Sequence, residues 1–307
     1  MADITAAMVK DLREKTGVGM MDCKAALAAA SGHMDAAVDW LRAKGLAKAA
    51  KKSIRVAAEG LVAIAVAGIE GAVVEVNSET DFVARNEQFQ AMVAEISKLA
   101  LAVGGDLEKL KVAKFPGSHH AVAEYVAEMV ATIGENLTVR RTAALKVAQG
   151  VIGSYVHNQV APNLGKIGVL VGLESTAKSD ELAQFGRMMA MHIAATNPVA
   201  MDLAAVPADT LAREKAILEE KNAGKPANVL EKIIASGLKT YAKENCLLEQ
   251  AYVHEGAKTV AQAIAEAANK AGAPVKLTGY VRMQLGEGIH KKDDDFAAEV
   301  AKMSRGP

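Results

Sequence analysis

Two parts of the chain repeat one plan, in which two apolar strands form a hairpin and a helix follows. Phe89 and Phe185 occupy equivalent positions in the two copies, and so do Gly60 and Gly150 just before the hairpins. The expected strands and helix are 61–66, 72–76 and 88–102 in the first copy, and 151–156, 168–173 and 180–195 in the second. A hairpin followed by a helix predicts an antiparallel sheet covered by that helix. We therefore expect an α+β protein with two related subdomains.

Helical segments flank the two copies. Residues 2–45 have the pattern of three short helices, which together would form a bundle close to the size limit of an independent fold. Two further helices, 208–222 and 227–244, are separated by the Gly and Pro of residues 224–226, and their apolar stripes predict a helical hairpin. The chain is expected to close with a strand over 276–285 and an amphipathic helix over 294–303.

These elements divide the chain into four expected units. The basic stretch 48–55 could be a solvated linker or a binding site, and the linker is favoured because runs of like charge are usually exposed. The units are a three-helix module at 1–54, a first core subdomain at 55–145, a second core subdomain at 146–285 with the helical hairpin at about 207–245, and a C-terminal helical module at 286–307.

The charge balance and the cysteines restrict the class of protein. Lys and Arg total 36, as do Asp and Glu, so the formal net charge is zero. A general nucleic-acid binder needs a basic face, so no direct nucleic-acid partner is expected. Cys23 and Cys246 suit a reducing compartment better than a disulfide framework. The longest apolar run, 61–69, is too short to span a bilayer and the start lacks a signal-peptide pattern, so we expect a cytoplasmic protein without membrane contact.

The sequence lacks the motifs of enzymes and cofactor sites. It has no P-loop, and Gly17-Val18-Gly19 lacks the third glycine and the preceding strand of a dinucleotide fingerprint. His119, His120 and Glu124 have helical metal-ligand spacing, but no further ligands cluster nearby, which favours a solvated helix start. No nucleophile, base and orienting acid can be placed together. We therefore expect no cofactor, no metal and no catalytic chemistry of its own.

A polar connection, residues 77–86, carries one large apolar side chain, Phe82. Because aromatic residues make up only 4% of the chain, this placement needs a reason. Phe82 could fold back on the following helix as a hydrophobic staple, with Asp81 near the N-cap, or it could protrude as an anchor for a partner pocket. The second copy of the repeat has Ala177-Lys178 at this place, so the fold does not require an aromatic residue there. The repeat therefore favours the protruding anchor.

The same comparison of the two copies concerns His192. It falls opposite Ile96, on the inward face of its helix. A lone histidine on such a face is usually buried with its hydrogen bonds satisfied. We therefore predict a core residue and not a ligand.

Four stretches of the sequence resemble the bacterial elongation factor Ts family, the nucleotide-exchange factors of the GTPase elongation factor Tu. They occur in family order and span nearly the whole chain. They are residues 16–27 (TGVGMMDCKAAL), 80–86 (TDFVARN), 133–141 (IGENLTVRR), and 286–288 (GEG) with 295–300 (DFAAEV). The sequence departs from related ones at His254, where methionine can stand, and in a longer second hairpin loop around 161–166.

The resemblance implies an exchange factor that weakens nucleotide binding to elongation factor Tu. In the family, an aspartate–phenylalanine pair reaches the nucleotide domain, and the phenylalanine wedges between two helices near the magnesium site. The matching residues here are Asp81 and Phe82. The terminal helix around 296–300 is similar to one that packs on the same domain. The further partner contacts that the resemblance implies are Lys24, Ile133, Gly134, His157 and Val253.

The resemblance also implies the nature of two helical units. The module at 1–54 would be ubiquitin-associated-like, and the hairpin at about 207–245 would be a projecting coiled-coil arm. The arm would either support self-association of the complex or an accessory contact, or use up its apolar stripe inside the hairpin.

Two other functions fit parts of the sequence. A ubiquitin-associated-type adaptor or nascent-chain chaperone would use residues 2–45, but it leaves the repeat and the Phe82 segment unexplained. A metal-dependent hydrolase would use His119, His120 and Glu124, and metal analysis of the purified protein would test it.

Overall fold

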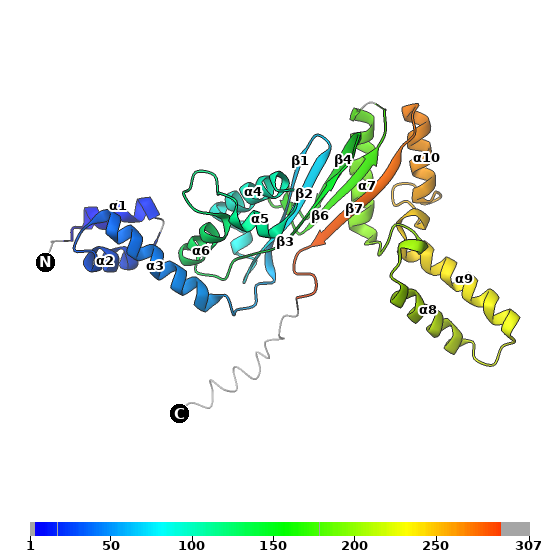
Figure 1. The fold of residues 1–307 in the computed structure, drawn as a ribbon, viewed down its shortest axis with the longest axis horizontal. Helices are drawn as coiled ribbons and strands as arrows, with labels where there is room; N and C mark the ends of the chain where they lie inside the picture. Colours follow the sequence, from blue (N-terminus) through cyan, green and yellow to red (C-terminus); the bar gives the residue numbers. More distant parts are fainter. Residues whose placement is uncertain (1–3, 17, 178, 290–307) are drawn as a thin grey trace.

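The computed structural model describes residues 4–16, 18–177 and 179–289 of the 307-residue chain. Its elements lie along one long axis (Figure 1). Three helices form one end, two sheets with their covering helices form the middle, and a helical hairpin projects at the other end. The chain is therefore a mixed α+β protein with antiparallel sheets, as the repeat predicts.

The first sheet contains the first predicted hairpin and has the strand order β3-β2-β1-β5. Its strands are β1 (Glu59–Ala67), β2 (Glu70–Ser78), β3 (Thr138–Lys146) and β5 (Leu164–Gly165). All pairs are antiparallel. β5 lies in the chain segment 146–285, so a short piece of the second predicted subdomain completes the sheet of the first.

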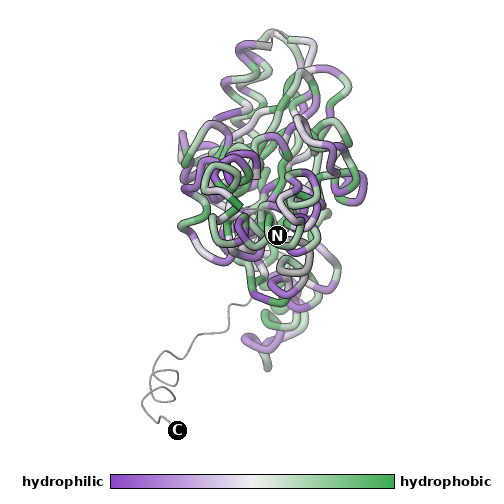
Figure 2. Tube along the Cα trace, turned by 90° about the vertical axis from the view of Figure 1, so that its left-hand side faces the viewer, coloured by the Kyte–Doolittle hydropathy of each residue, from purple (hydrophilic) through white to green (hydrophobic). Residues whose placement is uncertain are grey.

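Three helices pack around a core on one face of the first sheet: α4 (Glu87–Ala102), α5 (Leu107–Val112) and α6 (Val122–Ile133). Phe89 and Ile96 of α4 are fully buried in this core, beside Leu61 and Val74 of the hairpin. Residues seven apart lie on the same face of a helix, which explains why both point to the sheet. In Figure 2, hydrophilic and hydrophobic residues alternate along the helices, as one-sided burial requires.

The second sheet contains the second copy of the repeat and has the order β4-β6-β7. Its strands are β4 (Gly150–His157), β6 (Ile167–Glu174) and β7 (Lys276–Gln284), and its helices are α7 (Ser179–Thr196) and α10 (Val260–Ala271). Both helices share a buried core with β6. The predicted segments 151–156, 168–173 and 180–195 each fall inside an observed element. The hairpin-and-helix plan of the repeat is thus confirmed.

The two sheets pack face to face through a shared apolar layer. Val62 and Val73 of the first sheet meet Leu170 and Ile152 of the second in one buried cluster. Gly168 allows this approach, since an added Cβ would lie 2.7 Å from a Val62 methyl group. Strands that are buried on both faces have continuous apolar sequences without polar alternation. The first hairpin has this pattern.

The amino-terminal helices are α1 (Ala6–Thr16), α2 (Met20–Ala29) and α3 (Met34–Lys52). They enclose a small core with Leu12, Leu27 and Leu41. α3 is much longer than predicted, and it includes most of the basic stretch 48–55, so the interpretation of that stretch as a linker is wrong. Alanine, lysine and leucine are strong helix formers, and α3 also packs on α6, which favours continuing the helix.

The projecting hairpin consists of α8 (Ala208–Lys221) and α9 (Ala227–Asn245). Pro207 and Pro226 precede the two helices, as their fixed backbone angles favour. Gly237 lets the helices approach closely, because an added Cβ there would lie 2.5 Å from the Leu218 side chain. The helical hairpin is therefore present, and its role as a coiled-coil arm stays a prediction.

The last predicted unit, 286–307, is described only at its start. Gly286 and Gly288 have φ of 71° and 75°, which places a tight turn directly after β7. The predicted terminal helix over 294–303, with its candidate contacts at 296–300, lies outside the described residues. The division of the chain into four units also stays a prediction. No helix within the described residues is long and apolar enough to cross a membrane.

Gly153 tests the close packing of the second sheet on its helix. A Cβ added at Gly153 of β4 would lie 2.4 Å from the Gly186 backbone of α7. We expect Gly153→Ala to lower the free energy of unfolding by about 2 kcal/mol in urea titrations, because backbone atoms cannot move aside cheaply. Gly256→Ala is the matched control, since its added Cβ would have no neighbour within 4 Å. Equal stability of the two variants would contradict the packing described.

Candidate partner-binding site

The Phe82 loop, residues 79–86, connects β2 to α4 and presents its aromatic side chain to solvent. Phe82 is 76% exposed, whereas Val83 and Ala84, in a short 3-10 turn (Val83–Arg85), are 6% and 5% exposed. The N-cap of α4 is Asn86, whose Oδ1 accepts from Phe89 N–H at 3.0 Å. The staple hypothesis is therefore wrong: buried neighbours anchor the loop, and Phe82 points away.

Two glutamates tie the Phe82 loop to the residues that follow α6. Glu135 accepts hydrogen bonds from both Thr80 N–H at 2.9 Å and Thr80 Oγ1 at 2.6 Å. In the reverse direction, Glu79 accepts from Asn136 N–H at 2.6 Å. Each loop thus supplies a carboxylate to the other, and such charge-assisted hydrogen bonds are among the stronger ones in proteins.

The end of α3 joins the same two loops. Lys52 Nζ donates to the Gly134 carbonyl oxygen, and Asn136 Nδ2 donates to the Arg55 carbonyl oxygen at 2.8 Å. Arg55 also forms an ion pair with Glu79 at 3.5 Å. Three segments that are distant in the sequence are therefore held side by side at this surface.

The structure brings four of the predicted contact residues to one region. Asp81 and Phe82 are exposed on the Phe82 loop, and Gly134 is exposed on the loop bonded to it, in a left-handed conformation with φ of 94°. Ile133 is only half-buried and packs partly against the core of the first sheet. Lys24 lies on a different unit, on the exposed side of α2.

The remaining two predicted contacts, His157 and Val253, belong to the second sheet and its helices. His157 is exposed at the end of β4, and its Nδ1 lies 3.0 Å from the Tyr155 hydroxyl. Val253 is 48% exposed in the connection before α10. His254, the position that departs from related sequences, is also exposed, and its Nε2 lies 2.9 Å from the Met188 carbonyl oxygen.

The predicted core histidine holds the Val253 backbone in place. His192 is fully buried, and its Nδ1 accepts from Val253 N–H at 3.2 Å. Because Nδ1 is an acceptor, the hydrogen is on Nε2, which lies 3.0 Å from Gln250 Oε1. Burial lowers the pKa of His192 below its ordinary value, so the ring is neutral near pH 7.

A buried carboxylate that the sequence analysis missed joins two of the family-like stretches. Glu75 of β2 is fully buried and accepts from Arg140 at 3.0 Å, from Arg141 at 2.5 Å and from Gly286 N–H at 2.8 Å. Burial alone would raise the pKa of Glu75, but the hydrogen bonds from Gly286 N–H, Arg141 and Asn77 lower it below the usual value. The sequence does contain a sign of this buried carboxylate, because Glu75 is the single acidic residue inside the apolar run 72–76. A charge buried in such a run is tolerated only when it is paired.

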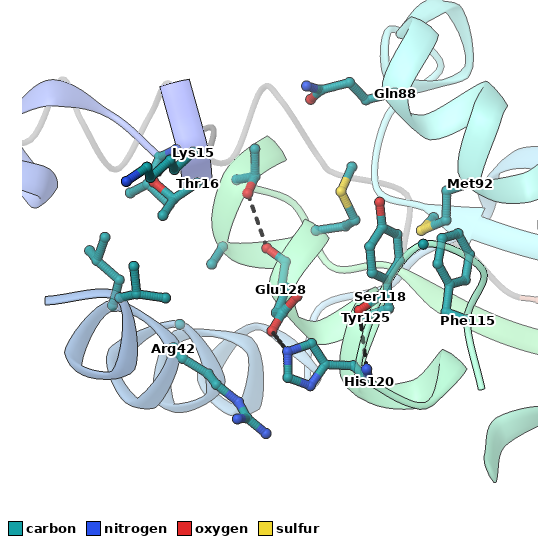
Figure 3. Close-up of a pocket in the computed structure, with 18 of the residues that line it drawn as sticks. Lys15, Thr16, Arg42, Gln88, Met92, Phe115, Ser118, His120, Tyr125 and Glu128 are labelled. Carbon is teal, nitrogen blue, oxygen red and sulfur yellow. Dashed lines mark hydrogen bonds and ion pairs between the residues drawn. The ribbon is translucent and has the colours of Figure 1, made fainter. Parts of the chain in front are cut away.

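A cleft of about 690 Å³ is lined by residues of α1, α3, α4 and α6, beside the contact of α3 with α6 (Figure 3). In it, His120 Nε2 lies 3.1 Å from Glu128 Oε1, and its Nδ1 lies 3.4 Å from Glu124. Among the described residues, no group of three or more His, Cys, Asp and Glu side chains is arranged to hold a metal ion. His120 thus lies between the carboxylates of Glu124 and Glu128, on the loop that precedes α6.

The position of His192 makes a pH prediction. Its pKa in the folded protein is below 6.5, its value when exposed, so the unfolded chain binds the proton more readily. Its contribution to stability is therefore complete above pH 6.5 and is lost as the pH falls through the folded pKa. We expect the free energy of unfolding, relative to that of His192→Gln, to decrease between about pH 7.5 and about pH 5. A difference that stays constant over this range would rule out the neutral buried ring.

Glu135 tests how the Phe82 loop is held. We expect Glu135→Ala to speed amide hydrogen exchange in residues 79–86 by about tenfold, because two hydrogen bonds to a charged group are lost. Glu108→Ala, which removes an exposed ion pair with Lys111 on α5, is the control and should leave that exchange unchanged. Unchanged protection of the loop in Glu135→Ala would mean that other contacts hold it.

Comparison with known proteins shows the family of the chain. A family model described as Elongation factor TS matches residues 79–287, a range that includes the Phe82 loop and the residues after α6 and begins four residues after Glu75. Elongation factor Ts of Methylobacterium radiotolerans is 62% identical over 305 residues, covering 99% of both chains. That of Methylobacterium nodulans is 61% identical over 307 residues, covering 100% of both, and that of Rhodopseudomonas palustris is 59% identical over 307 residues, covering 99% of both. The chain belongs to the elongation factor Ts family.

Proposed function

We propose that the chain releases GDP from the translational GTPase elongation factor Tu by inserting Phe82 near the magnesium site and stabilising the nucleotide-free form. Membership of the elongation factor Ts family makes the chain an elongation factor of protein biosynthesis that acts in nucleotide exchange. The finer steps, and the residues that carry them, are our proposal.

The observation that carries the proposal is that Phe82 is exposed on a loop whose backbone is held by hydrogen bonds to a neighbouring segment. The Phe82 side chain is 76% exposed, so it contributes little to the stability of the unbound protein. It can instead be buried in a pocket of a partner. The hydrogen bonds that Glu79 and Glu135 accept fix the loop before binding, so less conformational entropy is lost on association. Both features suit a wedge that must enter a pocket in a defined orientation.

Exchange can then follow from linkage without any chemistry on the nucleotide. A factor that binds the nucleotide-free GTPase more tightly than the GDP-bound form must weaken GDP binding by the same ratio. A thousandfold weakening corresponds to about 4 kcal/mol of coupling. Burial of one phenylalanine supplies roughly 2–3 kcal/mol before the pocket-opening cost, so Phe82 needs help from other contacts.

Magnesium is a suitable target for such a wedge. The ion demands near-ideal octahedral geometry, and small displacements of its ligands weaken binding. We propose that Phe82 moves the helices that carry these ligands and that Asp81 contacts the same domain. A magnesium ion bridges the nucleotide to the GTPase, so its loss would speed release of GDP.

Other contacts would supply the part of the coupling free energy that burial of Phe82 does not provide. Ile133 and Gly134 would meet the nucleotide domain beside Phe82, since their loop is bonded to the Phe82 loop through Glu135. Lys24, His157 and Val253 would contact the partner from other units, and so would the terminal helix around 296–300. We place this activity in the cytoplasm, without a cofactor, metal or direct nucleic-acid contact of its own.

The role of the helical hairpin is open to a simple measurement. We propose that α8 and α9 act as a projecting arm, which either supports self-association of the complex or packs only on itself. Sedimentation of the complex with and without residues 208–245 would separate these two roles. A lower mass for the shortened form, beyond that of the deleted segment, is expected only if the arm joins two complexes.

The proposal predicts a specific loss of exchange in Phe82→Ala. We expect the rate of release of a fluorescent GDP analogue from elongation factor Tu to fall by about tenfold or more at limiting concentrations of the chain, since most of a buried side chain's contribution is lost. The thermal midpoint should stay within about 2 °C of the wild type, because Phe82 is exposed and the fold does not bury it.

Val112→Ala is the matched control, since Val112 is 75% exposed on α5 and lies on another surface element. It should exchange at the wild-type rate. Wild-type rates in Phe82→Ala would remove the wedge from the mechanism. A chain that does not accelerate release at all would overturn the exchange function itself.

A further inference from the structure

The connection between α3 and β1 carries a large apolar side chain that the account above leaves unused. Ile54 is 87% exposed, more than Phe82 at 76%, and its neighbour Val56 is 50% exposed. Isolated exposed apolar residues are common on protein surfaces and need no explanation by themselves. The setting of Ile54 is what makes it informative.

Ile54 belongs to a segment that is held from both sides. Arg55 N–H donates to the Lys52 carbonyl oxygen at 2.9 Å, which closes a tight turn around Ile54. The Arg55 carbonyl oxygen accepts from Asn136 Nδ2 at 2.8 Å, and its guanidinium pairs with Glu79 at 3.5 Å. The backbone beside Ile54 is thus fixed to the two loops that carry Phe82 and Gly134.

The bonded residues also tie the segment of Ile54 to the Phe82 loop. Arg55 pairs with Glu79, and consecutive Cα atoms are only about 3.8 Å apart, so Ile54 and Phe82 are one and three residues from a shared ion pair. Asn136, which is 6% exposed, lies between the two segments and bonds to both. The Ile54 segment and the Phe82 loop are therefore parts of one bonded surface that a partner of Phe82 would approach.

We infer that Ile54 is a second apolar anchor for the same GTPase, buried in a shallow apolar depression beside the pocket for Phe82. This inference rests on the proposed function. An apolar side chain on a backbone that is already fixed loses little further entropy when it is buried, which is the usual property of an interface anchor. Ile54 contributes affinity, whereas Phe82 acts on the nucleotide site, so the two residues have separable effects.

The test measures catalysed release of a fluorescent GDP analogue from elongation factor Tu over a range of concentrations of the full chain. We expect Ile54→Ser to raise the concentration for half-maximal rate by about tenfold while the maximal rate stays at the wild-type value, because affinity common to all states is lost. Ile54→Leu should restore the wild-type concentration dependence. Val112→Ser, at a similarly exposed position on α5, should match the wild type.

The thermal midpoints of the four proteins identify any variant whose fold is altered, and little change is expected at exposed positions. If Ile54→Ser gives the same concentration dependence as Val112→Ser while Phe82→Ala is impaired, the inference is wrong and the proposed function stands. If the wild-type chain does not accelerate release, both fall. A lowered maximal rate in Ile54→Ser would also overturn the inference, because it would place Ile54 in the exchange step.

Discussion

The candidate site depends on reciprocal hydrogen bonds between the Phe82 loop and the residues after α6, in which each segment supplies one carboxylate acceptor. Glu135 holds Thr80 by two hydrogen bonds, and Glu79 holds Asn136 by one. Without them, a polar loop with an exposed aromatic side chain would lose its fixed orientation. With them, the chain presents Phe82 on a backbone that is already ordered, which lowers the entropy lost on binding.

The sheet sandwich gives these loops a rigid support. The two hairpins of the repeat bury a common apolar layer, and Gly168 allows their close approach. Glu75 adds a polar tie, because it bonds Arg140 and Arg141 of β3 and the turn at Gly286 after β7. Breaking one partner of a buried charge network is costly, so the start of the C-terminal segment is fixed to the strand that leads into the Phe82 loop.

The predictable part of the structure was the part governed by local periodicity. The repeat placed β1, β2, α4, β4, β6 and α7 correctly, because strands and helices there have clear apolar patterns. The length of α3 was missed, since its second half is stabilised by helix propensity and by packing on α6, which a charge run does not reveal. The glutamates that hold the site were also missed: Glu79 and Glu135 are ordinary surface residues until the fold brings their loops together. The exposure of Phe82 could be anticipated from the comparison of the two copies and from the family resemblance, because local pattern alone also allowed a hydrophobic staple.

The most direct test of this account is a double-mutant cycle of Phe82→Ala and Glu135→Ala, measured as the rate of GDP release from elongation factor Tu at limiting concentrations of the chain. If Glu135 acts by orienting Phe82, its removal should slow exchange in the wild-type background and have little further effect once Phe82 is alanine, a coupling of about 1 kcal/mol or more. Independent, additive losses would contradict the account, because Glu135 would then act without Phe82.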